Sequence, residues 1–461
     1  MIASLLLLAF LDWPQFRGPA ALGVSEGHPL PTEFNAKKNL VWQVPLPPGH
    51  SSPIVVGKRL FVTAFEGENL FTIALSTETG KELWRQQAPR PRKEHFQKTN
   101  GPASPSPASD GQRVFTFFGD FGLLAYTVEG KPLWQMPLGP FNNPNGHGSS
   151  PIVADGTVVL LCDQDTNSYL LAADTKTGKV KYKIERPEVT RGYGLPALYK
   201  PPSGPVEMIV PGAYLTVAYN FVTGEKLWWF GGMSWQSKSP PILIDGILYQ
   251  SSWETGGDGP MPEVPQFDEI QAAHDKDNNG KLDAPEALAY GIKAGGFTAA
   301  DLDHDGFLDS REWGFYRMLK QTRNALVAAR PGGRGDVSNS HVLWRYTKSL
   351  PNTAAPLYYA GALWIVKDGG VLTTLNPKTG EVIKQGRLTG ALEQYWASPV
   401  AGDGKVYLIS AAGKVVVLKG DAQWEILAMN ELEDEVFATP ALVNGRIYLR
   451  TRSSLYCFAQ R

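Results

Sequence analysis

Two short acidic segments place oxygen-bearing side chains at the spacing that a hard metal cation requires. They span residues 275–286 and 301–312, and each has Asp or Asn at its first, third and fifth positions, Gly at its sixth and Glu at its twelfth. Ca²⁺ takes about seven oxygen ligands, and a loop with this spacing supplies them from side chains and from the main-chain carbonyl at its seventh position. The ligands predicted for two calcium ions are Asp275, Asp277, Asn279, Lys281 (carbonyl), Asp283 and Glu286, and Asp301, Asp303, Asp305, Phe307 (carbonyl), Asp309 and Glu312.

The two segments resemble the loops of the EF-hand family. The resemblance implies that Gly280 and Gly306 permit the sharp turn at the sixth position, and that Leu282 and Leu308 pair in a short bridge between the loops. Only residues 287–300 separate the loops, so the helices on either side must be short. Calcium sensors need helices that swing apart to expose a groove. We therefore expect calcium to order this segment instead of switching it between two states.

The chain that must position these loops repeats one unit eight times. Each unit opens with a residue pair that ends in Pro, continues into an apolar run, turns at Gly and enters a second apolar run. The openings are Ser52-Pro53, Ser106-Pro107, Ser150-Pro151, Leu195-Pro196, Pro240-Pro241, Ala355-Pro356, Ser398-Pro399 and Thr439-Pro440. Most intervals between these prolines fall near the ~40–50 residues of a four-stranded propeller blade. The long interval, from Pro241 to Pro356, contains both acidic loops.

A Thr-Gly turn followed by an aromatic residue recurs near the end of several units. The first unit reads TGKELW over residues 79–84 and the fourth reads TGEKLW over 223–228, whereas Tyr182 and Lys384 take the place of the Trp in the third and sixth units. An aromatic side chain at a fixed place can pack on the next blade. The pattern resembles the tryptophan-docking motif of pyrroloquinoline-quinone (PQQ) repeat propellers. The resemblance implies an all-β, eight-bladed propeller, with an early strand around residues 40–42 completing the last blade.

These patterns divide the chain into four parts. We predict a signal segment at residues 1–12, propeller blades one to five at 13–255, an EF-hand insertion in blade five at 256–322, and the rest of blade five to blade eight at 323–461. The apolar run from Leu5 to Phe10 is typical of a secretory signal. The sequence WPQFRGP that follows is similar to the mature start of many exported bacterial proteins with PQQ repeats. We therefore expect a periplasmic or secreted protein.

The composition excludes some classes of partner. The chain is 43% hydrophobic and 19% charged, with a formal net charge of -1. Because it has no cluster of Lys and Arg, we expect no nucleic-acid partner. No stretch approaches the length of a transmembrane helix. Cys162 and Cys457 lie in apolar runs, so we expect two buried thiols. We expect the protein to be a monomer.

Residues just before each inner strand should line the mouth of the central channel. Aromatic and polar side chains that converge there favour a protein, peptide or small carbohydrate-like ligand. Ordinary packing of loops around the ring is the alternative interpretation. The candidates for a ligand-binding face are His50, His147, Arg191, Tyr193, Trp235, Gln236, Tyr395 and Trp396, and Lys238 and Gln394 lie beside them.

Three functions are compatible with the sequence. The first is a non-enzymatic, calcium-binding propeller that acts as a binding or scaffolding module, akin to the BamB-type assembly proteins. The second is a PQQ-dependent dehydrogenase of alcohols or sugars, and the third is a hydrolase or lyase with an active site at the channel mouth. The resemblance implies a vicinal cysteine pair for the dehydrogenases, whereas Cys162 and Cys457 are far apart in this chain. We therefore expect a binding protein, with calcium and without PQQ.

Overall fold

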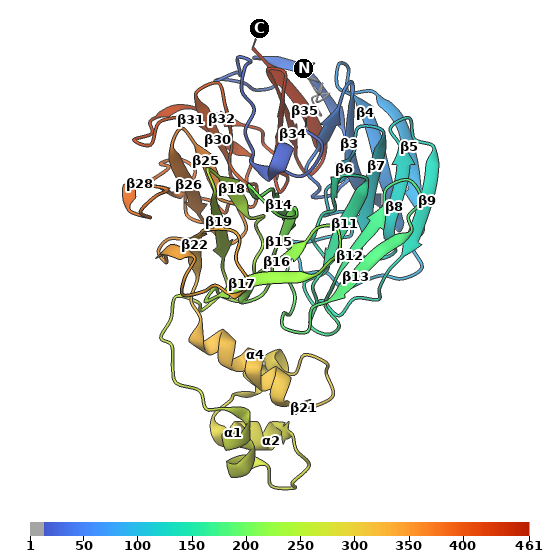
Figure 1. Cartoon of the computed structure of the whole chain (residues 1–461). Coiled ribbons are helices and arrows are strands. Elements are labelled where there is room, and N and C mark those ends of the chain that lie inside the picture. The colour runs from blue at the N-terminus through green and yellow to red at the C-terminus, as the bar shows by residue number, and fades with distance from the viewer. Residues whose placement is uncertain (1–12, 461) are drawn as a thin grey trace.

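The computed structural model describes residues 13–460, which form a closed ring of eight antiparallel sheets, or blades (Figure 1). The predicted signal segment, residues 1–12, lies outside the described residues. Blades one to four consist of β2 (Ile54–Val56), β3 (Arg59–Glu66), β4 (Asn69–Ser76) and β5 (Glu82–Ala88); β6 (Ala108–Ser109), β7 (Arg113–Phe118), β8 (Gly122–Thr127) and β9 (Pro132–Pro137); β10 (Ile152–Ala154), β11 (Thr157–Cys162), β12 (Tyr169–Asp174) and β13 (Val180–Glu185); and β14 (Ala197–Tyr199), β15 (Glu207–Pro211), β16 (Leu215–Asn220) and β17 (Lys226–Gly231).

The second half of the ring follows the same order, with one interruption in blade five. Blades five to eight consist of β18 (Ile242–Ile244), β19 (Ile247–Ser252), β22 (Ala325–Ala329) and β24 (Val342–Tyr346); β25 (Leu357–Tyr359), β26 (Ala362–Lys367), β27 (Val371–Leu375) and β28 (Val382–Arg387); β29 (Val400–Gly402), β30 (Lys405–Ile409), β31 (Lys414–Lys419) and β32 (Ile426–Glu431); and β33 (Ala441–Val443), β34 (Arg446–Arg450), β35 (Ser454–Ala459) and β1 (Leu40–Pro45). A short strand of blade five, β23 (Gly335–Asp336), pairs in parallel with β17 of blade four.

Closure of the ring joins the two ends of the chain in one sheet. Strand β1 pairs antiparallel with β35, so the last blade has its outer strand from the start of the chain. This confirms the prediction for residues 40–42. The pairing leaves the ring without an open seam, which is how propellers avoid exposed sheet edges.

The docking aromatics join each blade to the next at a repeated geometry. The indole N–H of Trp84 donates to the carbonyl of Val128 in the following blade (3.0 Å), and that of Trp134 donates to Thr175 (3.0 Å). The Thr-Gly turns fit against these rings, because a Cβ on Gly130 would lie 2.7 Å from Trp84. Lys384 replaces the indole with an ammonium group that donates to the carbonyls of the next blade. Repetition of the motif is therefore a device for joining blades.

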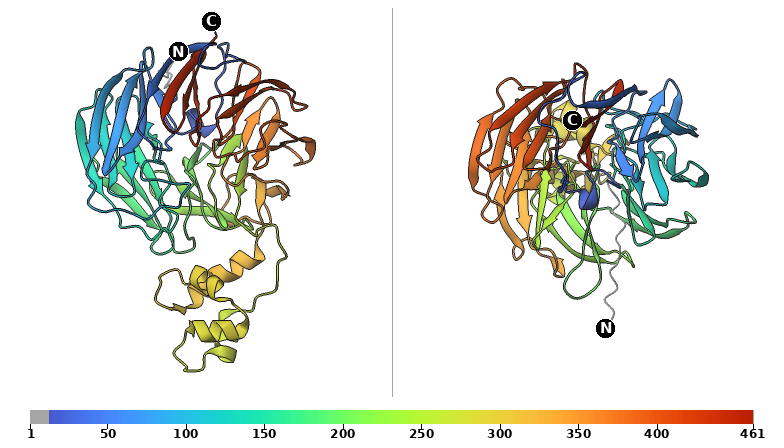
Figure 2. Two further views of the ribbon diagram at one scale, coloured as in Figure 1. Left: turned by 180° about the vertical axis from the view of Figure 1, so that it is seen from behind. Right: turned by 90° about the horizontal axis from the view of Figure 1, so that it is seen from above.

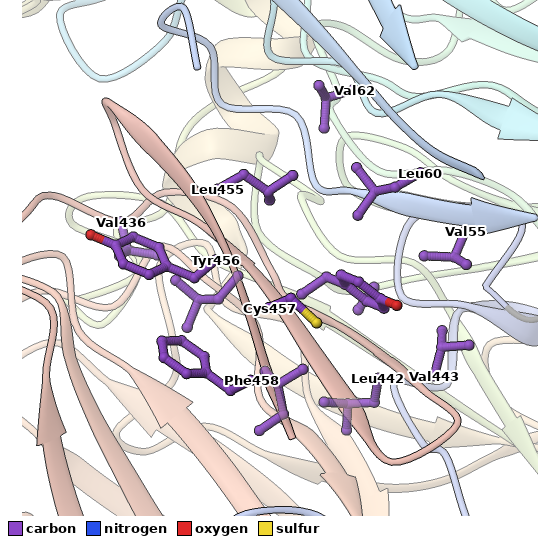
Figure 3. Close-up of a cluster of buried hydrophobic side chains, with 14 of the residues drawn as sticks. Val55, Leu60, Val62, Val436, Leu442, Val443, Leu455, Tyr456, Cys457 and Phe458 are labelled. Atoms are coloured by element: carbon purple, nitrogen blue, oxygen red, sulfur yellow. The ribbon is translucent and has the colours of Figure 1, made fainter. Parts of the chain in front are cut away.

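The core consists of apolar layers between neighbouring blades. Inner strand β2 is buried along its whole length, as expected for a strand packed on both faces. Figure 3 shows the layer between blades one and eight. Its buried side chains include Val55, Leu60 and Val62 from blade one and Leu442, Leu455 and Cys457 from blade eight. Both cysteines are buried, as predicted.

The segment between β19 and β22 is helical and leaves the ring. We call residues 253–324 the helical insert, and its helices lie below the propeller in Figure 1 and in the left view of Figure 2. The predicted insertion, 256–322, is slightly shorter. Its elements are α1 (Phe267–His274), β20 (Leu282–Asp283), α2 (Ala284–Tyr290), α3 (Ala294–Ala300), β21 (Phe307–Leu308) and α4 (Ser310–Gln321). As expected, α2 and α3 are short, at seven residues each.

The N-terminal part of the described chain crosses the channel. Trp13 pairs with Val55 of blade one, and Val24 pairs with Ala401 of blade seven. Between them a 3₁₀ helix, η1 (Pro19–Ala21), follows Arg17, whose buried guanidinium donates to the carbonyl of Pro356 in blade six (2.8 Å). Within residues 13–460, no helix is long and apolar enough to cross a membrane.

Candidate functional sites

The first acidic loop joins α1 to α2 and is held by its last residue. The carboxylate of Glu286 accepts the main-chain N–H of Lys276 (2.7 Å) and of Asp283 (3.0 Å), so it clamps both ends of the loop. Asp283 in turn caps α2 by accepting the N–H of Glu286 (2.9 Å). This reciprocal pair is a capping box, which satisfies free N–H groups at a helix start.

The second loop joins α3 to α4 in the same way. Glu312 accepts the N–H groups of Leu302 (2.7 Å) and Asp309 (3.0 Å), and Asp309 caps α4. The two loops meet in an antiparallel bridge in which Leu282 pairs with Leu308, as predicted. Lys281 of the first loop also forms an ion pair with Asp305 of the second (2.5 Å).

Three carboxylates of each loop lie close together. Carboxylate oxygens of Asp275, Asp277 and Glu286 lie within 4.8 Å of one another, as do those of Asp301, Asp303 and Asp305. Asp301 is 8% exposed, and its Oδ1 is buried without a hydrogen-bond partner among the described residues. A buried carboxylate oxygen without a partner costs free energy unless a cation or donor meets it. The donor set therefore fits a hard cation such as Ca²⁺.

The second loop also contacts the propeller. The carbonyl of Leu302 accepts a hydrogen bond from Asn142 Nδ2 of the propeller (2.8 Å). Arg311, at the start of α4, donates to the carbonyl of Asp165 (3.0 Å), and the ring of Phe315 stacks on Tyr214 at 6.1 Å. The insert therefore docks through the end that carries the second loop.

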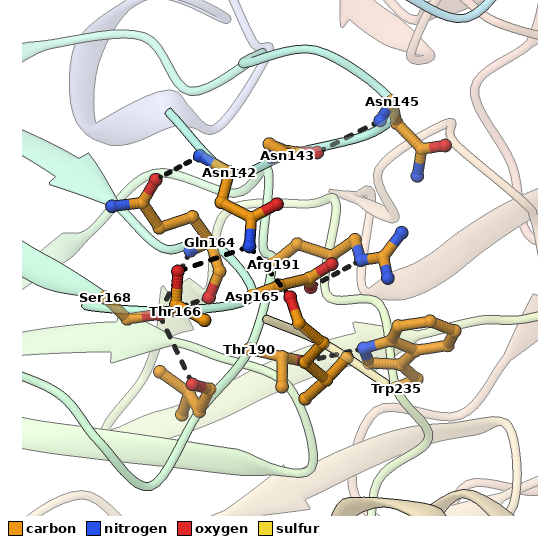
Figure 4. A network of polar contacts seen from close by, with 12 residues as sticks. Asn142, Asn143, Asn145, Gln164, Asp165, Thr166, Ser168, Thr190, Arg191 and Trp235 are labelled. Atoms are coloured by element: carbon orange, nitrogen blue, oxygen red, sulfur yellow. Dashed lines mark hydrogen bonds and ion pairs between the residues drawn. The ribbon is translucent and has the colours of Figure 1, made fainter. Parts of the chain in front are cut away.

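A polar network continues from this contact toward the channel (Figure 4). Asp165 binds Arg191 (2.6 Å), and the guanidinium of Arg191 lies 4.6 Å from the centre of the Trp235 ring. The indole N–H of Trp235 donates to Thr190 (2.6 Å). Trp235 thus stands between the docked insert and the channel mouth.

The channel mouth contains a cavity of about 570 Å³. This volume lies within the range of small-molecule sites, which is roughly 300–1,000 Å³. The predicted residues that line it are His50, Tyr193, Trp235, Gln236, Lys238 and Trp396. The lining residues that the sequence did not indicate include Phe16, Gln97, Asn100, Asn145, Trp253, Glu254, Asn352 and Phe437.

The remaining predicted residues of this face lie elsewhere. His147 is buried between the rings of Phe117 and Phe141, behind the cavity wall. Arg191 forms an ion pair with Asp165 and is not among the residues that line the cavity. Tyr395 is buried in the core of blades six and seven, and its hydroxyl donates to the carbonyl of Ala391 (2.7 Å). Position before an inner strand predicts a place near the mouth, but adjacent residues of such a loop point in different directions.

Two side chains give the cavity its charge. Burial lowers the pKa of Lys238 to about 8, and its ammonium group donates to Asn352 Oδ1 (2.5 Å). Burial raises the pKa of Glu254 to about 7, although Lys320 and Lys238 act in the opposite direction. Burial, with Arg450 and Arg452, also lowers the pKa of His50 to about 4, so its ring is neutral at pH 7.

Glu254 connects this wall to the helical insert. Its main-chain N–H donates to Asn324 Oδ1 (2.8 Å), and its carbonyl accepts from Asn324 Nδ2 (3.1 Å). Asn324 follows closely after α4, the helix that begins at the second acidic loop. One helix therefore leads from the acidic loop to the residue that fixes the cavity wall. The sequence contains one signal for the role of Glu254 in the cavity wall. Trp253 and Glu254 directly follow β19, the last propeller strand before the helices of the insert.

Comparison with known proteins gives one family match. The profile of the family described as outer membrane protein assembly factor BamB matches residues 32–257 and 325–461, and the gap between them falls on the helical insert. A search of curated proteins finds no match.

Solved structures with a similar fold include a BamB protein and two dehydrogenases. BamB from Moraxella catarrhalis is 13% identical, with a TM-score of 0.57 over 92% of this chain and 97% of that one. A europium-containing methanol dehydrogenase is 11% identical, with a TM-score of 0.59 over 97% and 98%. Quinohemoprotein alcohol dehydrogenase from Comamonas testosteroni is 13% identical, with a TM-score of 0.58 over 97% and 80%. At these identities the similarity shows the fold alone.

Proposed function

Because the chain belongs to the family of outer membrane protein assembly factor BamB, we propose that it is a calcium-dependent binding protein whose ligand enters the cavity at the channel mouth. The observation that carries this proposal is the double role of residues 253–255. They line the cavity, and they are also the point at which the helical insert leaves the propeller. The insert thus supplies part of the binding site.

Calcium has a defined part in this proposal. Each acidic loop binds one ion through the ligands predicted from its sequence, as in an EF-hand. The support is the convergence of carboxylates in both loops and the unpartnered Oδ1 of Asp301. Asp283 and Asp309 cap helices in this structure, so they act in the outer sphere, through water.

Bound calcium holds the cavity wall through α4. Glu312 lies in the first turn of this helix, and Lys320 lies in its last turn, near Glu254. An ion that binds Glu312 fixes the start of α4, and the bonds from Asn324 to Glu254 transmit this order to the wall. Calcium therefore orders the site and takes no part in chemistry.

The cavity does not fit PQQ. This cofactor carries three carboxylates, and sites for such anions use several Arg or Lys side chains. Lys238 is the basic side chain among the described lining residues, and Glu254 adds an acidic group. We therefore propose binding in place of quinone-dependent oxidation. Hydrolase or lyase chemistry has less support, because His147 and Arg191 lie outside the cavity lining and the His50 ring stacks on Phe437 at 4.1 Å.

The family supports a proposal about the cellular setting. We propose that the protein is a monomer in the periplasm or outside the cell. Fractionation of cells that express the full gene tests this, and recovery of the protein only in the cytoplasm would contradict it. The molar mass of the purified protein, measured by light scattering, tests whether it is a monomer.

The experiment for the binding function is a thermal-shift screen of the calcium-loaded protein. The panel contains disaccharides, amino acids, acetylated tetrapeptides and PQQ. A ligand at about 100 times its Kd stabilises the folded state by about 2.7 kcal/mol. We expect a shift with at least one class, lost in Trp396→Ala and kept in Trp229→Ala, which changes a half-buried Trp on the outer strand of blade four. No shift with any class, or a shift that survives in Trp396→Ala, would contradict the proposal.

A further inference from the structure

The walls of the cavity present aromatic rings from opposite sides of the propeller. On one side His50 stacks on Phe437 (4.1 Å between ring centres, 16° between planes), and Phe437 stacks on Trp396 (6.4 Å, 18°). These residues precede blades one, eight and seven. Tyr193 and Trp235, which precede blades four and five, lie across the channel in an eight-membered ring. Aromatic side chains from blades on opposite sides of the channel therefore line the cavity.

Several polar groups in the cavity lining form no hydrogen bond within residues 13–460. The side chains of Gln97, Gln236 and Glu254 line the cavity and make no hydrogen bond or ion pair within residues 13–460. The indole N–H groups of Trp253 and Trp396 have no partner there either. An amide offers both donors and an acceptor, and an indole N–H only donates. The carboxyl group of Glu254, with a pKa of about 7, accepts when it is ionised and can also donate when it is protonated. The free groups thus form a mixed set that matches hydroxyl groups, which donate and accept at once.

The charge of the cavity excludes strongly ionic ligands. Lys238 and Glu254 are the charged side chains among the described lining residues, and Asn352 and the Trp253 ring already surround the ammonium group of Lys238. A polyanion would lack cations to pair with, and a polycation would lack carboxylates. An uncharged ligand loses no ionic hydration on entry, which avoids the cost of burying a charge.

We propose that the cavity binds an uncharged saccharide, one or two pyranose rings long, between its two aromatic walls. The proposal rests on the binding function above. The ring faces of a sugar carry C–H groups that pack on Trp396 and Trp235, and its edges carry hydroxyl groups within reach of Gln236 and Glu254. A site built to hydrogen-bond hydroxyl groups also discriminates strongly against ligands that lack them.

The test is isothermal titration calorimetry of the full, calcium-loaded chain with three uncharged disaccharides: cellobiose, maltose and N,N′-diacetylchitobiose. Sorbitol is the matched control, because it has the hydroxyl groups of a sugar without the ring faces. We expect at least one disaccharide to bind and sorbitol not to bind. Glu254→Gln and Trp396→Ala should each weaken binding by about tenfold or more, as expected for the loss of a buried contact in a small site.

Further variants keep the test decisive. Gln236→Ala removes a side chain without internal hydrogen bonds, so it preserves the fold and should also weaken binding. Glu185→Gln and Trp229→Ala change the same residue types on the outer strands of blades three and four and should bind as the native protein does. If the disaccharides fail while an amino acid, a peptide or PQQ binds and depends on Trp396, the saccharide assignment is wrong and the binding function stands. If nothing binds in the cavity, both fail.

Discussion

The main-chain N–H of Thr439 donates to Ser52 Oγ at 2.9 Å, across 387 positions of sequence. The same bond joins neighbouring units around the channel, in the order Ala355 to Ser398, Ser398 to Thr439, Thr439 to Ser52, Ser52 to Ser106, and Ser106 to Ser150. The hydroxyl that opens a unit therefore satisfies a buried N–H of the unit before it. We call this series of hydrogen bonds the belt. It stops at the fourth and fifth units, whose openings have Leu195 and Pro240.

Ser52→Ala breaks this belt where the ring closes. It leaves the Thr439 N–H buried without a partner, so we expect a loss of about 1–3 kcal/mol in the free energy of unfolding. Chemical denaturation measures this. The control is Ser203→Ala, at an exposed loop position, which should change stability by less than about 0.5 kcal/mol. Equal effects of the two changes would refute the role of the belt.

Gly80→Ala tests the docking of Trp42 on the first Thr-Gly turn. A Cβ at Gly80 would lie 2.7 Å from the Trp42 ring, at a φ of +71°. We expect a loss of about 2 kcal/mol or more, from strain at positive φ plus displacement of the indole. Gly57→Ala is the matched control, because it has a φ of +57° with open space around the Cβ, and should cost only about 1 kcal/mol. Similar losses would show that docking contributes little.

Much of the fold was predictable because the repeat shows each local rule several times. The sequence alone predicts the Thr-Gly turn, the docking aromatic and the strand that completes blade eight. The Ser-Pro and Thr-Pro openings contain the hydroxyl groups of the belt, but the sequence does not indicate the hydrogen bonds that these groups form. The sequence shows that a hydroxyl residue recurs at the position of Ser52 in the unit. It does not show which N–H the hydroxyl oxygen accepts.

His147 makes stability depend on pH. Its ring nitrogens have no partner among the described residues, and burial lowers its pKa to about 3. An unfolded His titrates near pH 6.5, so between these values the unfolded chain binds more protons than the folded one. Stability should therefore fall as pH drops from 6.5 toward 3, by about 1.4 kcal/mol per pH unit from this group.

His147→Leu replaces the ring with an apolar side chain of similar volume and should flatten this dependence. Denaturation curves at pH 7, 6 and 5 measure it. His95→Leu, at an exposed position, is the control and should keep the native pH dependence. A His147→Leu protein with an unchanged slope would show that the buried ring is not responsible.

Calcium binding is testable one loop at a time. Glu286→Gln and Glu312→Gln each remove a terminal carboxylate, so each should abolish one of two sites in a terbium luminescence titration. Glu269→Gln changes an exposed residue of α1 and should keep both sites. Native protein that binds no ion at millimolar calcium would overturn the calcium proposal.

The cavity was the least predictable feature. The repeat predicts its position at the channel mouth and the lining residues His50, Tyr193, Trp235 and Trp396. It does not predict Phe16 and Glu254, because they come from outside the repeated unit. Phe16 lies in the N-terminal segment that crosses the channel, and Glu254 lies at the root of the insert. Tyr395 shows the opposite error, since it is next to Trp396 in sequence but points into the core.

Hydrogen–deuterium exchange, with and without calcium, tests most directly whether the calcium-ordered insert holds the cavity wall. We expect calcium to slow exchange in both acidic loops, in α4 and also at Glu254, whose N–H is bonded to Asn324. Glu312→Gln should lose the protection at Glu254, whereas Glu269→Gln should keep it. Protection that is confined to the loops, with exchange at residues 253–257 unchanged by calcium, would contradict the proposed link between the metal sites and the cavity.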